Sequence, residues 1–572
     1  MKKKLLTLFI LIVALPTVWA TNIYYEITQE KSVSQIQNEI NAIIETSSQG
    51  DTITVTGSKT DADATLTLSY GYSRVYFIWQ AIYKSNSSFT ADNLIRLSGN
   101  SFPLMGSTFE LADGALITEN ANAINASGTN TLVMVSGEGK IATSGDGYSA
   151  ILTDWDVDIK DNAQLTITTG EVITSNGNKA VITVSSGTLT ATSGNAIVAF
   201  GNETRIYISG GYLSNDADNR YPVVVIPNSN VLPFAVIEVS GNAIIQAKGM
   251  GCGIISDTDV HIKGNAQVIS NDAGSDNFSA SVRVRKSIQV SGNAKVTARE
   301  GYAILCNGYV SVFDSAKVEA KENAIAIFMG SGYTQISTVS VMGKAQVTAE
   351  NNFAIAHNKQ NTIFSLYNGA VFAYGKDISD VTVFTSLDTG YYTSGGVVLA
   401  WDKEAGNTNY EMFSTEDIYV FPESATAYWD KKDGKYGISY ANRENTGFIP
   451  LDVIVLSINE NKPLSNLKVY PNPTTGVIYI SSEQADEWTS GQVDEIFDVY
   501  DIFGRKQKAE SRKGKFPSNS LEGWTRSGRG GEEGWQPQAD GVVMDISHLP
   551  AGIYFVKITT TAGEVVKKVV KE

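Results

Sequence analysis

A short phrase that recurs about every 25 residues constrains the fold of this chain more than any other feature. The phrase reads small, small, Ala, polar, apolar, polar, small, and its clear copies are Gly241-Asn242-Ala243, Gly264-Asn265-Ala266 and Gly292-Asn293-Ala294. Degenerate copies include Asp161-Asn162-Ala163, Asp314-Ser315-Ala316, Gly343-Lys344-Ala345 and Asn368-Gly369-Ala370. The third residue of each copy gives eleven anchors with a mean spacing of 25.5 residues: Ala115, Lys140, Ala163, Thr188, Tyr212, Ala243, Ala266, Ala294, Ala316, Ala345 and Ala370.

Each repeat predicts three short strands. The first precedes the anchor, the second follows it, and the third is an "Ala-Ile" phrase such as Ala303-Ile304. Gly, Asn, Asp and Ser occupy the predicted turns, where they tolerate a left-handed backbone. Period-two alternation predicts one apolar face, with polar residues such as Lys295 on the other side. In the repeat around residue 294 that face holds Val290, Ala294, Val296, Ala298 and Leu305.

Three strands per repeat and one apolar face predict an all-β fold with a parallel β-helix over residues 61–382. A single repeat cannot bury its inner face alone, whereas stacked repeats share a continuous narrow core. An array of β-sandwiches stays open as an alternative, because 25 residues also accommodate hairpin strands. The pattern resembles right-handed, pectin-lyase-like β-helices.

The regions beside the repeats are less regular. Helical spacing of Val33, Ile36, Ile40, Ile43 and Ile44 predicts an amphipathic helix in residues 21–60, which we assign as an N-terminal cap leading into a first strand at 52–56. The aromatic segment 70–83 would stack on sugar rings if exposed, but core packing is the favoured interpretation. Residues 383–456 are interpreted as a small β-module and 457–463 as a linker.

The first 20 residues have the pattern of a secretory signal peptide. Three lysines precede an apolar run from Leu5 to Leu15, and Val18 and Ala20 stand at the −3 and −1 positions, so we expect cleavage after Ala20. The apolar run is shorter than the roughly 20 residues that cross a bilayer, and we expect no transmembrane segment in the mature chain. Cleavage would lower the formal charge from −16 to −19, which argues against binding nucleic acid or anionic lipid directly.

The composition changes again over residues 464–572, where three motifs follow one another. The first is Val469 to Gly476 (VYPNPTTG), the second is Phe497 to Arg505 (FDVYDIFGR), and the third is Met544 to Ile558 (MDISHLPAGIYFVKI). The chain then ends on Val565 to Lys571 (VVKKVVK). Short strands separated by stiff Pro and Gly turns predict a small sandwich.

These motifs closely resemble the type A sorting domain of the type IX secretion system. The resemblance implies an immunoglobulin-like sandwich, recognition by the type IX machinery, a Gram-negative host, and release or attachment to surface lipopolysaccharide; an ordinary immunoglobulin-like terminal domain is the alternative. A Gly-rich insertion at 509–541 departs from the usual shorter loop. The predicted sorting-motif residues are Pro471, Asn472, Pro473, Gly476, Gly504, Arg505, Leu549, Pro550, Gly552, Tyr554, Lys567 and Lys568.

The sequence shows no pattern of catalytic residues. Asp154, Asp156 and Asp158 alternate and are weak candidates for Ca²⁺, although a solvated edge is favoured, and no other cofactor is expected. Arg283, Arg285 and Lys286 could meet an acidic glycan but are favoured as a solvated loop, and His261 should face outward without a partner.

The two cysteines, Cys252 and Cys306, lie two repeats apart, about 10 Å along the stack, so we expect two free and buried thiols. We therefore expect a non-catalytic surface protein that acts as an adhesin or as a structural or carbohydrate-binding scaffold. The alternative is a polysaccharide lyase or hydrolase that acts on an acidic glycan.

Overall fold

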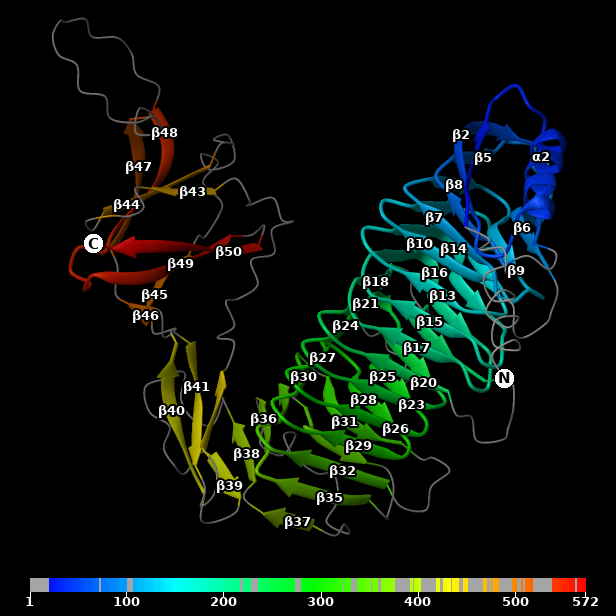
Figure 1. The fold of residues 1–572 in the computed structure, drawn as a ribbon. Coiled ribbons are helices and arrows are strands. Elements are labelled where there is room, and N and C mark those ends of the chain that lie inside the picture. The colour runs from blue at the N-terminus through cyan, green and yellow to red at the C-terminus, as the bar shows by residue number, and fades with distance from the viewer. Residues whose placement is uncertain are drawn as a thin grey trace, which may run out of the picture. The chain divides into compact units, whose positions relative to one another are not determined.

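The computed structural model describes most of the repeat region and separate strands of the C-terminal region (Figure 1). It describes residues 20–375 except 71–73, 100–105, 217–219, 228–234, 273–278, 323, 331–336, 351 and 358–361. Beyond them it describes 391–394, 396–402, 418–421, 425–433, 435–441, 446–450, 467–470, 474, 477–482, 496–501, 506–507, 510–517, 538–560 and 563–571. The chain divides into two compact units, and Met1–Asp402 forms most of the first.

The first unit is a parallel β-helix in which strands of successive coils stack as three ladders. All strand pairs within these ladders are parallel, which excludes the sandwich array. Ladder one consists of β1 (Asn22–Ile27), β2 (Thr52–Ala62), β4 (Tyr76–Trp79), β7 (Thr108–Ala112), β10 (Leu132–Ser136), β13 (Val157–Ile159), β15 (Val181–Val184), β17 (Arg205–Ile208), β20 (Val236–Val239), β23 (Asp259–Ile262), β26 (Ser287–Val290), β29 (Tyr309–Val312), β32 (Ser337–Met342), β35 (Thr362–Tyr367) and β37 (Tyr391–Ser394).

Ladders two and three form the other walls of the helix. Ladder two consists of the end of β2, β5 (Ile82–Ser85), β8 (Ala115–Thr118), β11 (Lys140–Thr143), β14 (Gln164–Ser175), β16 (Thr188–Ala199), β18 (Tyr212–Asn215), β21 (Ile244–Met250), β24 (Gln267–Asp272), β27 (Lys295–Ala298), β30 (Lys317–Ala320), β33 (Gln346–Glu350), β36 (Ala370–Gly375) and β38 (Val397–Asp402). Ladder three consists of β3 (Leu66–Ser69), β6 (Asn93–Ser98), β9 (Asn122–Ala126), β12 (Ser149–Thr153), the ends of β14 and β16, β19 (Val223–Val225), β22 (Ile254–Ser256), β25 (Ala280–Val284), β28 (Tyr302–Cys306), β31 (Ile325–Met329) and β34 (Ile355–His357).

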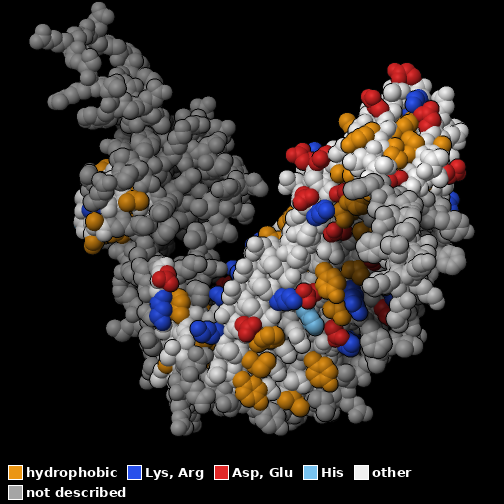
Figure 2. All heavy atoms as spheres, viewed as in Figure 1, with side chains coloured by type: hydrophobic (Ala, Val, Ile, Leu, Met, Phe, Trp, Pro, Cys, Tyr) orange, Lys and Arg blue, Asp and Glu red, His pale blue; other side chains and the backbone are white. Residues whose placement is uncertain are grey.

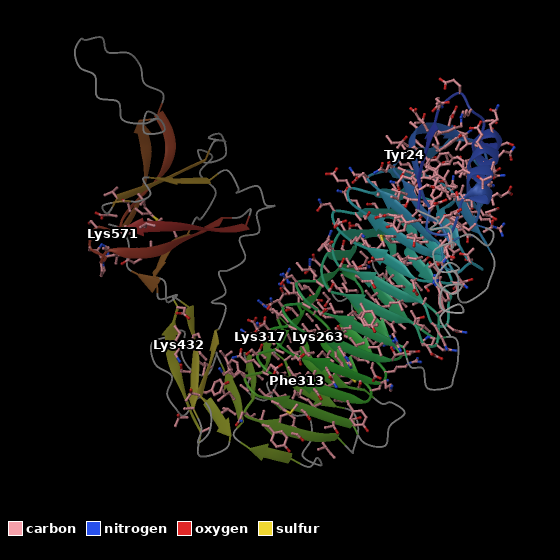
Figure 3. The ribbon with its side chains drawn as sticks, in the orientation of Figure 1. Tyr24, Lys263, Phe313, Lys317, Lys432 and Lys571 are labelled. Carbon is pink, nitrogen blue, oxygen red and sulfur yellow. The ribbon has the colours of Figure 1, made fainter. Side chains whose placement is uncertain are left out.

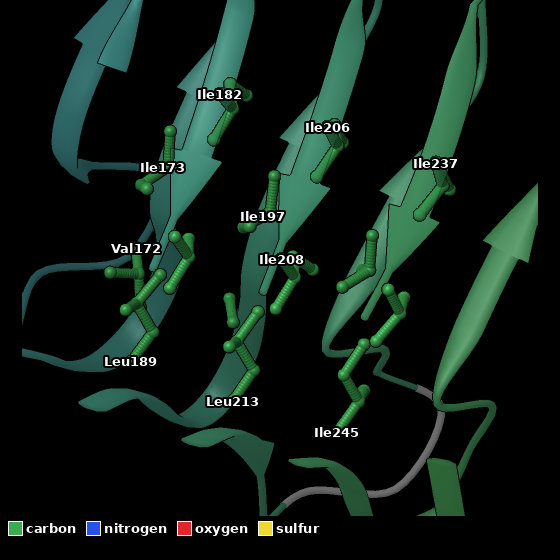
Figure 4. Close-up of a cluster of buried hydrophobic side chains, with 14 of the residues drawn as sticks. Val172, Ile173, Ile182, Leu189, Ile197, Ile206, Ile208, Leu213, Ile237 and Ile245 are labelled. Carbon is green, nitrogen blue, oxygen red and sulfur yellow. The ribbon is translucent and has the colours of Figure 1, made fainter. Parts of the chain in front are cut away.

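The core is a column of small and branched apolar side chains between the ladders (Figure 4). Val290, Ala294, Val296 and Ala298 are all fully buried in it, as the alternation predicts. Leu305 corrects that prediction: it belongs to a separate cluster with Cys252 and Ala280, whereas its neighbours Ile304 and Cys306 lie in the main core. The alternation changes within the short third strand, so Leu305 lies on the outer side.

The strand register also corrects part of the anchor frame. Lys140 pairs with Ala115 and with Gln164, so the alanine anchor Ala163 lies one position earlier in its coil. Thr188, Tyr212 and Ala370 also stand one register position after the place that the other alanine anchors occupy. For example, Tyr212 pairs with Ile244, the residue after Ala243. Glycines occupy the shifted positions because space there is short: a Cβ on Gly139 would lie 2.6 Å from the carbonyl oxygen of Leu111.

The turn after ladder one is stabilised by polar ladders. Gly264 has a φ of 70°, a left-handed conformation that glycine adopts readily. The next residue, Asn265, donates from Nδ2 to Asn242 Oδ1 at 3.2 Å and accepts at Oδ1 from Asn293 Nδ2 at 3.2 Å. The repeated Gly-Asn-Ala phrase therefore combines a turn, an asparagine ladder and a buried alanine.

The predicted helix is present as α2 (Val33–Thr46), and it buries Val33, Ile36, Ile40 and Ile44 in the main core. Ile43 is partly buried against the same core. Ser32 begins the helix with a capping box: its Oγ accepts from Gln35 N at 3.2 Å, and Gln35 Oε1 accepts from Ser32 N at 2.9 Å.

The parallel ladder begins before α2, because β1 pairs with β2 along its whole length. Just ahead of β1, the Thr21 nitrogen donates to Asp51 Oδ1 at 2.8 Å, and Thr52 N donates to Thr21 O at 2.9 Å. The β-helix therefore extends on both sides of the predicted 61–382, since β37 and β38 also continue ladders one and two into the predicted β-module.

The C-terminal region contains three further sheets. The strand β39 (Ile418–Phe421) precedes them in the sequence. The first of these sheets consists of β40 (Thr426–Lys432), β41 (Lys435–Ala441) and β42 (Thr446–Pro450). Two four-stranded antiparallel sheets follow, β43-β44-β48-β47 and β46-β45-β49-β50. Their strands are β43 (Leu467–Tyr470), β44 (Val477–Ser482), β45 (Ile496–Asp501), β46 (Lys506–Gln507), β47 (Glu510–Pro517), β48 (Gln538–Asp545), β49 (Gly552–Thr560) and β50 (Gly563–Lys571).

Two further expectations concern the cysteines and membrane-spanning helices. Cys252 and Cys306 are both buried and form no disulfide, and Ser256 and Cys306 share one register position on either side of Val284, as predicted. Within the described residues, no helix combines the length and the apolar character that a membrane crossing needs.

Candidate functional site

The third C-terminal motif forms a tight connection between β48 and β49. Asp545 Oδ1 accepts from Ser547 N at 2.8 Å, and Leu549 N donates to Ile546 O at 3.0 Å. The Tyr554 hydroxyl then donates to Pro550 O at 2.7 Å. Leu549 and Tyr554 are buried while Pro550 is exposed, so apolar contacts and two hydrogen bonds between side chains and backbone stabilise the connection.

The final strand β50 pairs with β49 over its full length, from Gly552 opposite Lys571 to Thr560 opposite Gly563. Lys567 and Lys568 lie opposite Val556 and Phe555 in this register. Because β50 stands at one end of its sheet, its outer edge carries backbone groups that can pair with another strand.

Thr474 joins the first motif to the end of the chain. Its nitrogen donates to Val570 O at 2.8 Å, it bridges to Lys571, and its Oγ1 donates to Val477 O at 2.9 Å. The structure therefore brings the first motif into contact with the terminal segment 565–571, nearly 100 residues later in the sequence.

Several predicted sorting-motif residues lie outside the described residues. These are Pro471, Asn472, Pro473, Gly476, Gly504 and Arg505. The predicted signal segment 1–19 also lies outside them, and Ala20 is exposed. The predicted insertion 509–541 is not a loop throughout, because Glu510–Pro517 and Gln538–Asp545 pair as β47 and β48.

The three aspartates proposed for calcium have separate structural roles. Asp154 Oδ2 accepts from Gly128 N at 2.8 Å, and Asp156 Oδ1 accepts from Val181 N at 2.7 Å, so these two carboxylates bind backbone of neighbouring coils on opposite sides. Burial raises the pKa of both Asp156 and Asp158. Within the described ranges, no three His, Cys, Asp or Glu side chains form a group that could hold a metal ion, so the geometry gives the calcium hypothesis no support.

Two of the three predicted basic residues, Arg285 and Lys286, belong to ion pairs between coils. Arg285 Nη1 lies 3.0 Å from Asp257 Oδ2, and Lys286 Nζ lies 2.5 Å from Asp259 Oδ2. His261 alternates with buried Val260 and Ile262 and faces outward, as predicted. These charges are largely balanced by their neighbours, which weakens their attraction for an acidic ligand.

Most described aromatic residues of the segment 70–83 pack inward, as favoured from the sequence, whereas Tyr76 lies on the outer side of ladder one. Phe77, Trp79 and Tyr83 are fully buried, and the Phe77 and Phe109 rings stack with centroids 5.8 Å apart. They are thus unavailable to stack on a sugar.

Sequence reasoning missed a cluster around Glu110 on the outer side of ladder one. Glu110 is buried and accepts from the hydroxyls of Tyr76 and Ser136, while Lys160 Nζ lies 4.0 Å from its Oε1. Burial and the hydrogen bond to Glu110 both raise the pKa of Tyr76. A carboxylate that already accepts two hydroxyl donors stabilises this face, and a tyrosine with a raised pKa stays protonated at neutral pH and cannot act as a base there.

The same outer face changes character towards the C-terminal end of the β-helix (Figure 2). The outward positions of β26, β29, β32 and β35, with the residues directly after β26 and β29, form what we call the neutral strip, because none of them is charged. The neutral strip consists of Ser287, Gln289, Ser291, Tyr309, Ser311, Phe313, Thr338, Ser340, Met342, Ile363, Ser365 and Tyr367. The one feature of the sequence that points to the strip is the pair Tyr309 and Phe313, four residues apart. Tyr309 begins β29 and Phe313 directly follows it.

Comparison with known proteins identifies the tail. Residues 536–572 match the family of the secretion system C-terminal sorting domain, a region that includes β48, β49 and β50. No curated protein and no solved structure matches the chain significantly.

Proposed function

We infer that the sorting tail directs secretion through the type IX system, with recognition by its machinery and export to the cell surface or the extracellular space. We propose that the chain is a non-catalytic binding protein displayed on, or released from, a Gram-negative bacterium. In this proposal the β-helix acts as an adhesin or as a structural or carbohydrate-binding scaffold. The observation that carries the proposal is one chain that combines a sorting tail with a long parallel β-helix whose outer face contains a neutral, partly aromatic surface.

The ends of the chain have their own roles in this proposal. The signal peptide is removed after Ala20, and β1 and α2 cap the N-terminal end, a role supported by the burial of α2 in the main core. The two C-terminal four-stranded sheets form the immunoglobulin-like sorting domain, which the machinery removes on export. The exported part is then released or attached to lipopolysaccharide.

An enzyme acting on an acidic glycan is the alternative function. Its best location is the Glu110 cluster, where Asp158 follows Glu110 after one intervening strand in the register. Glu110→Gln separates the two interpretations: loss of reducing-end release from polygalacturonate would support the enzyme. Absence of such release from the unsubstituted chain would support the binding protein.

The export proposal is tested by deleting residues 464–572 in a host that has a type IX system. The truncated protein should remain in the periplasm as a folded, β-rich protein, because the β-helix has its own continuous core. Removal of Lys567–Glu572 alone should already impair export, since β50 pairs along all of β49 and bridges to Thr474. Fractionation and immunoblotting, with a periplasmic marker and the full chain as controls, give the measurement.

A neutral reporter that carries a signal peptide and residues 464–572 provides the converse test, and it should reach the surface or the medium. Surface delivery of the truncated chain at the level of the full chain would contradict the proposal.

A further inference from the structure

The neutral strip differs from the rest of the outer face of ladder one in its charge. The coil before it carries Asp259, which pairs with Lys286 directly ahead of β26, and Lys263, whose Nζ lies 2.9 Å from Glu238 Oε1. None of the 12 outward positions of the strip is ionisable at neutral pH, in a chain with a formal charge of −16. The strip is therefore an uncharged surface on an acidic protein.

The strip has three columns that run along the axis of the β-helix. One outer column is Tyr309, Thr338 and Ile363, and the register pairs these residues directly. The other outer column ends with Phe313, Met342 and Tyr367. Met342 and Tyr367 are paired in the register. Phe313, which Figure 3 labels, directly follows β29. Tyr309 and Tyr367 are 49% and 44% exposed, so their rings are accessible from solvent.

A row of hydroxyl groups lies between the two outer columns. Ser311, Ser340 and Ser365 stand opposite one another in the register, and each is flanked within its strand by the larger side chains of the outer columns. Ser311 and Ser340 are partly exposed, whereas Ser365 is buried. The outer columns are four residues apart, about 13 Å along an extended strand, and successive strands are about 4.8 Å apart. Short serine side chains therefore occupy the middle of a surface with bulkier, partly aromatic sides.

This chemistry matches a neutral polysaccharide chain. Sugar rings have apolar faces that pack on aromatic rings, and hydroxyl edges that donate to and accept from serine and glutamine. An uncharged ligand experiences no electrostatic repulsion from the surrounding carboxylates, whereas an anionic glycan would be repelled by the net negative charge of the chain. The regular strand spacing repeats the same contacts along the axis, as a polymer of similar units requires.

We propose that the neutral strip binds a neutral polysaccharide that lies along the axis of the β-helix, with Tyr309, Phe313 and Tyr367 packing on sugar rings and Ser311 and Ser340 contacting ring hydroxyls. The inference names a ligand class for the proposed surface function and rests on it. It is tested with purified full chain, so that its outcome is independent of export.

The experiment is affinity gel electrophoresis of the full chain in gels that contain hydroxyethylcellulose, xylan, mannan or polygalacturonate. We expect at least one of the three neutral polymers to retard the chain and the anionic polymer to have no effect. Tyr309→Ala and Tyr367→Ala should each weaken retardation at least about fivefold, as for aromatic residues at the centre of an interface. Tyr24→Ala is the matched control, because Tyr24 is 73% exposed on β1 and lies outside the strip.

Circular dichroism verifies that each variant is folded, and Ser340→Asp provides a second probe that adds a charge to the middle row without removing a ring. Ser340→Asp should also abolish retardation. Four results would overturn the proposal: no neutral polymer retards the chain, only polygalacturonate does, Tyr24→Ala weakens retardation as much as Tyr309→Ala, or the chain self-associates until Tyr309→Ala disperses it. Each of these results leaves the export test unaffected.

Discussion

Replacement of Val296 by Asp tests whether the stacked core stabilises the β-helix. Val296 is fully buried in β27, between Val268 and Val318 of the adjacent coils. An aspartate there loses about 1.5 kcal/mol of apolar burial at the least. Its carboxylate would lie among apolar side chains, where burial raises the pKa of such a group by about 3 to 5 units, or about 4 to 7 kcal/mol at 1.36 kcal/mol per unit.

At pH 8 the two contributions give about 6 to 7 kcal/mol, because a carboxyl whose folded pKa rises above 8 folds in its protonated form. This cost is comparable to the whole stability of many domains. The destabilisation should depend on pH with a definite sign. An acidic group whose folded-state pKa is raised favours the folded state only below its unfolded pKa, and that contribution is lost as the pH rises through the folded pKa. Val296→Asp should therefore be less destabilising at pH 5 than at pH 8.

The assay is guanidinium denaturation followed by far-UV circular dichroism at both pH values. Val296→Asn is the neutral control and should destabilise without this pH dependence. Lys295→Asp is the surface control: it removes the half-exposed pair between Lys295 Nζ and Glu319 Oε2, 2.8 Å apart, and should cost no more than about 1 kcal/mol. Equal midpoints for Val296→Asp and Lys295→Asp would refute the assignment of the inner face.

Three further perturbations have defined outcomes. Burial raises the pKa of Cys252 to about 11 and that of Cys306 to about 12. Ellman's reagent at pH 8 should therefore detect almost no thiol in the native chain and two thiols after unfolding. A disulfide found by non-reducing mass mapping would contradict this expectation. Tyr554→Phe removes the hydrogen bond to Pro550 O, so it should destabilise the tail by about 1 kcal/mol and reduce export, and unchanged export would show that the bond is not needed for recognition. Burial, Asp161 and Glu110 raise the pKa of Asp158. Asp158→Asn should therefore raise the melting temperature at pH 7, and the difference from the unsubstituted chain should shrink towards pH 4. A difference that stays constant with pH would show that the ionised carboxylate is not its cause.

The β-helix was predictable because its core imposes a local pattern. Val296 and Lys295 are neighbours with opposite burial, and that contrast is visible in one strand. The sorting tail was predictable because its motifs are local too. Leu305 was misplaced because the third strand is only five residues long and several successive positions in it are buried, which leaves no alternation to read.

The neutral strip was not predictable in the same way. Its columns depend on register between coils of unequal length: Tyr309 stands opposite Ser287, 22 positions earlier, and opposite Thr338, 29 positions later. The Glu110 cluster has the same origin, since its partners Tyr76 and Ser136 come from different coils. A mean repeat length cannot align such residues.

The contact at Thr21 links processing of the chain to the start of the β-helix. While residue 20 is attached, the Thr21 nitrogen is an amide that donates to Asp51, and this bond lowers the pKa of the Asp51 carboxyl. Cleavage after Ala20 would convert that nitrogen into a terminal ammonium, so the same two atoms would form an ion pair without moving. Cleavage at this position would then strengthen the contact that holds Thr21, just ahead of the first strand, against Asp51.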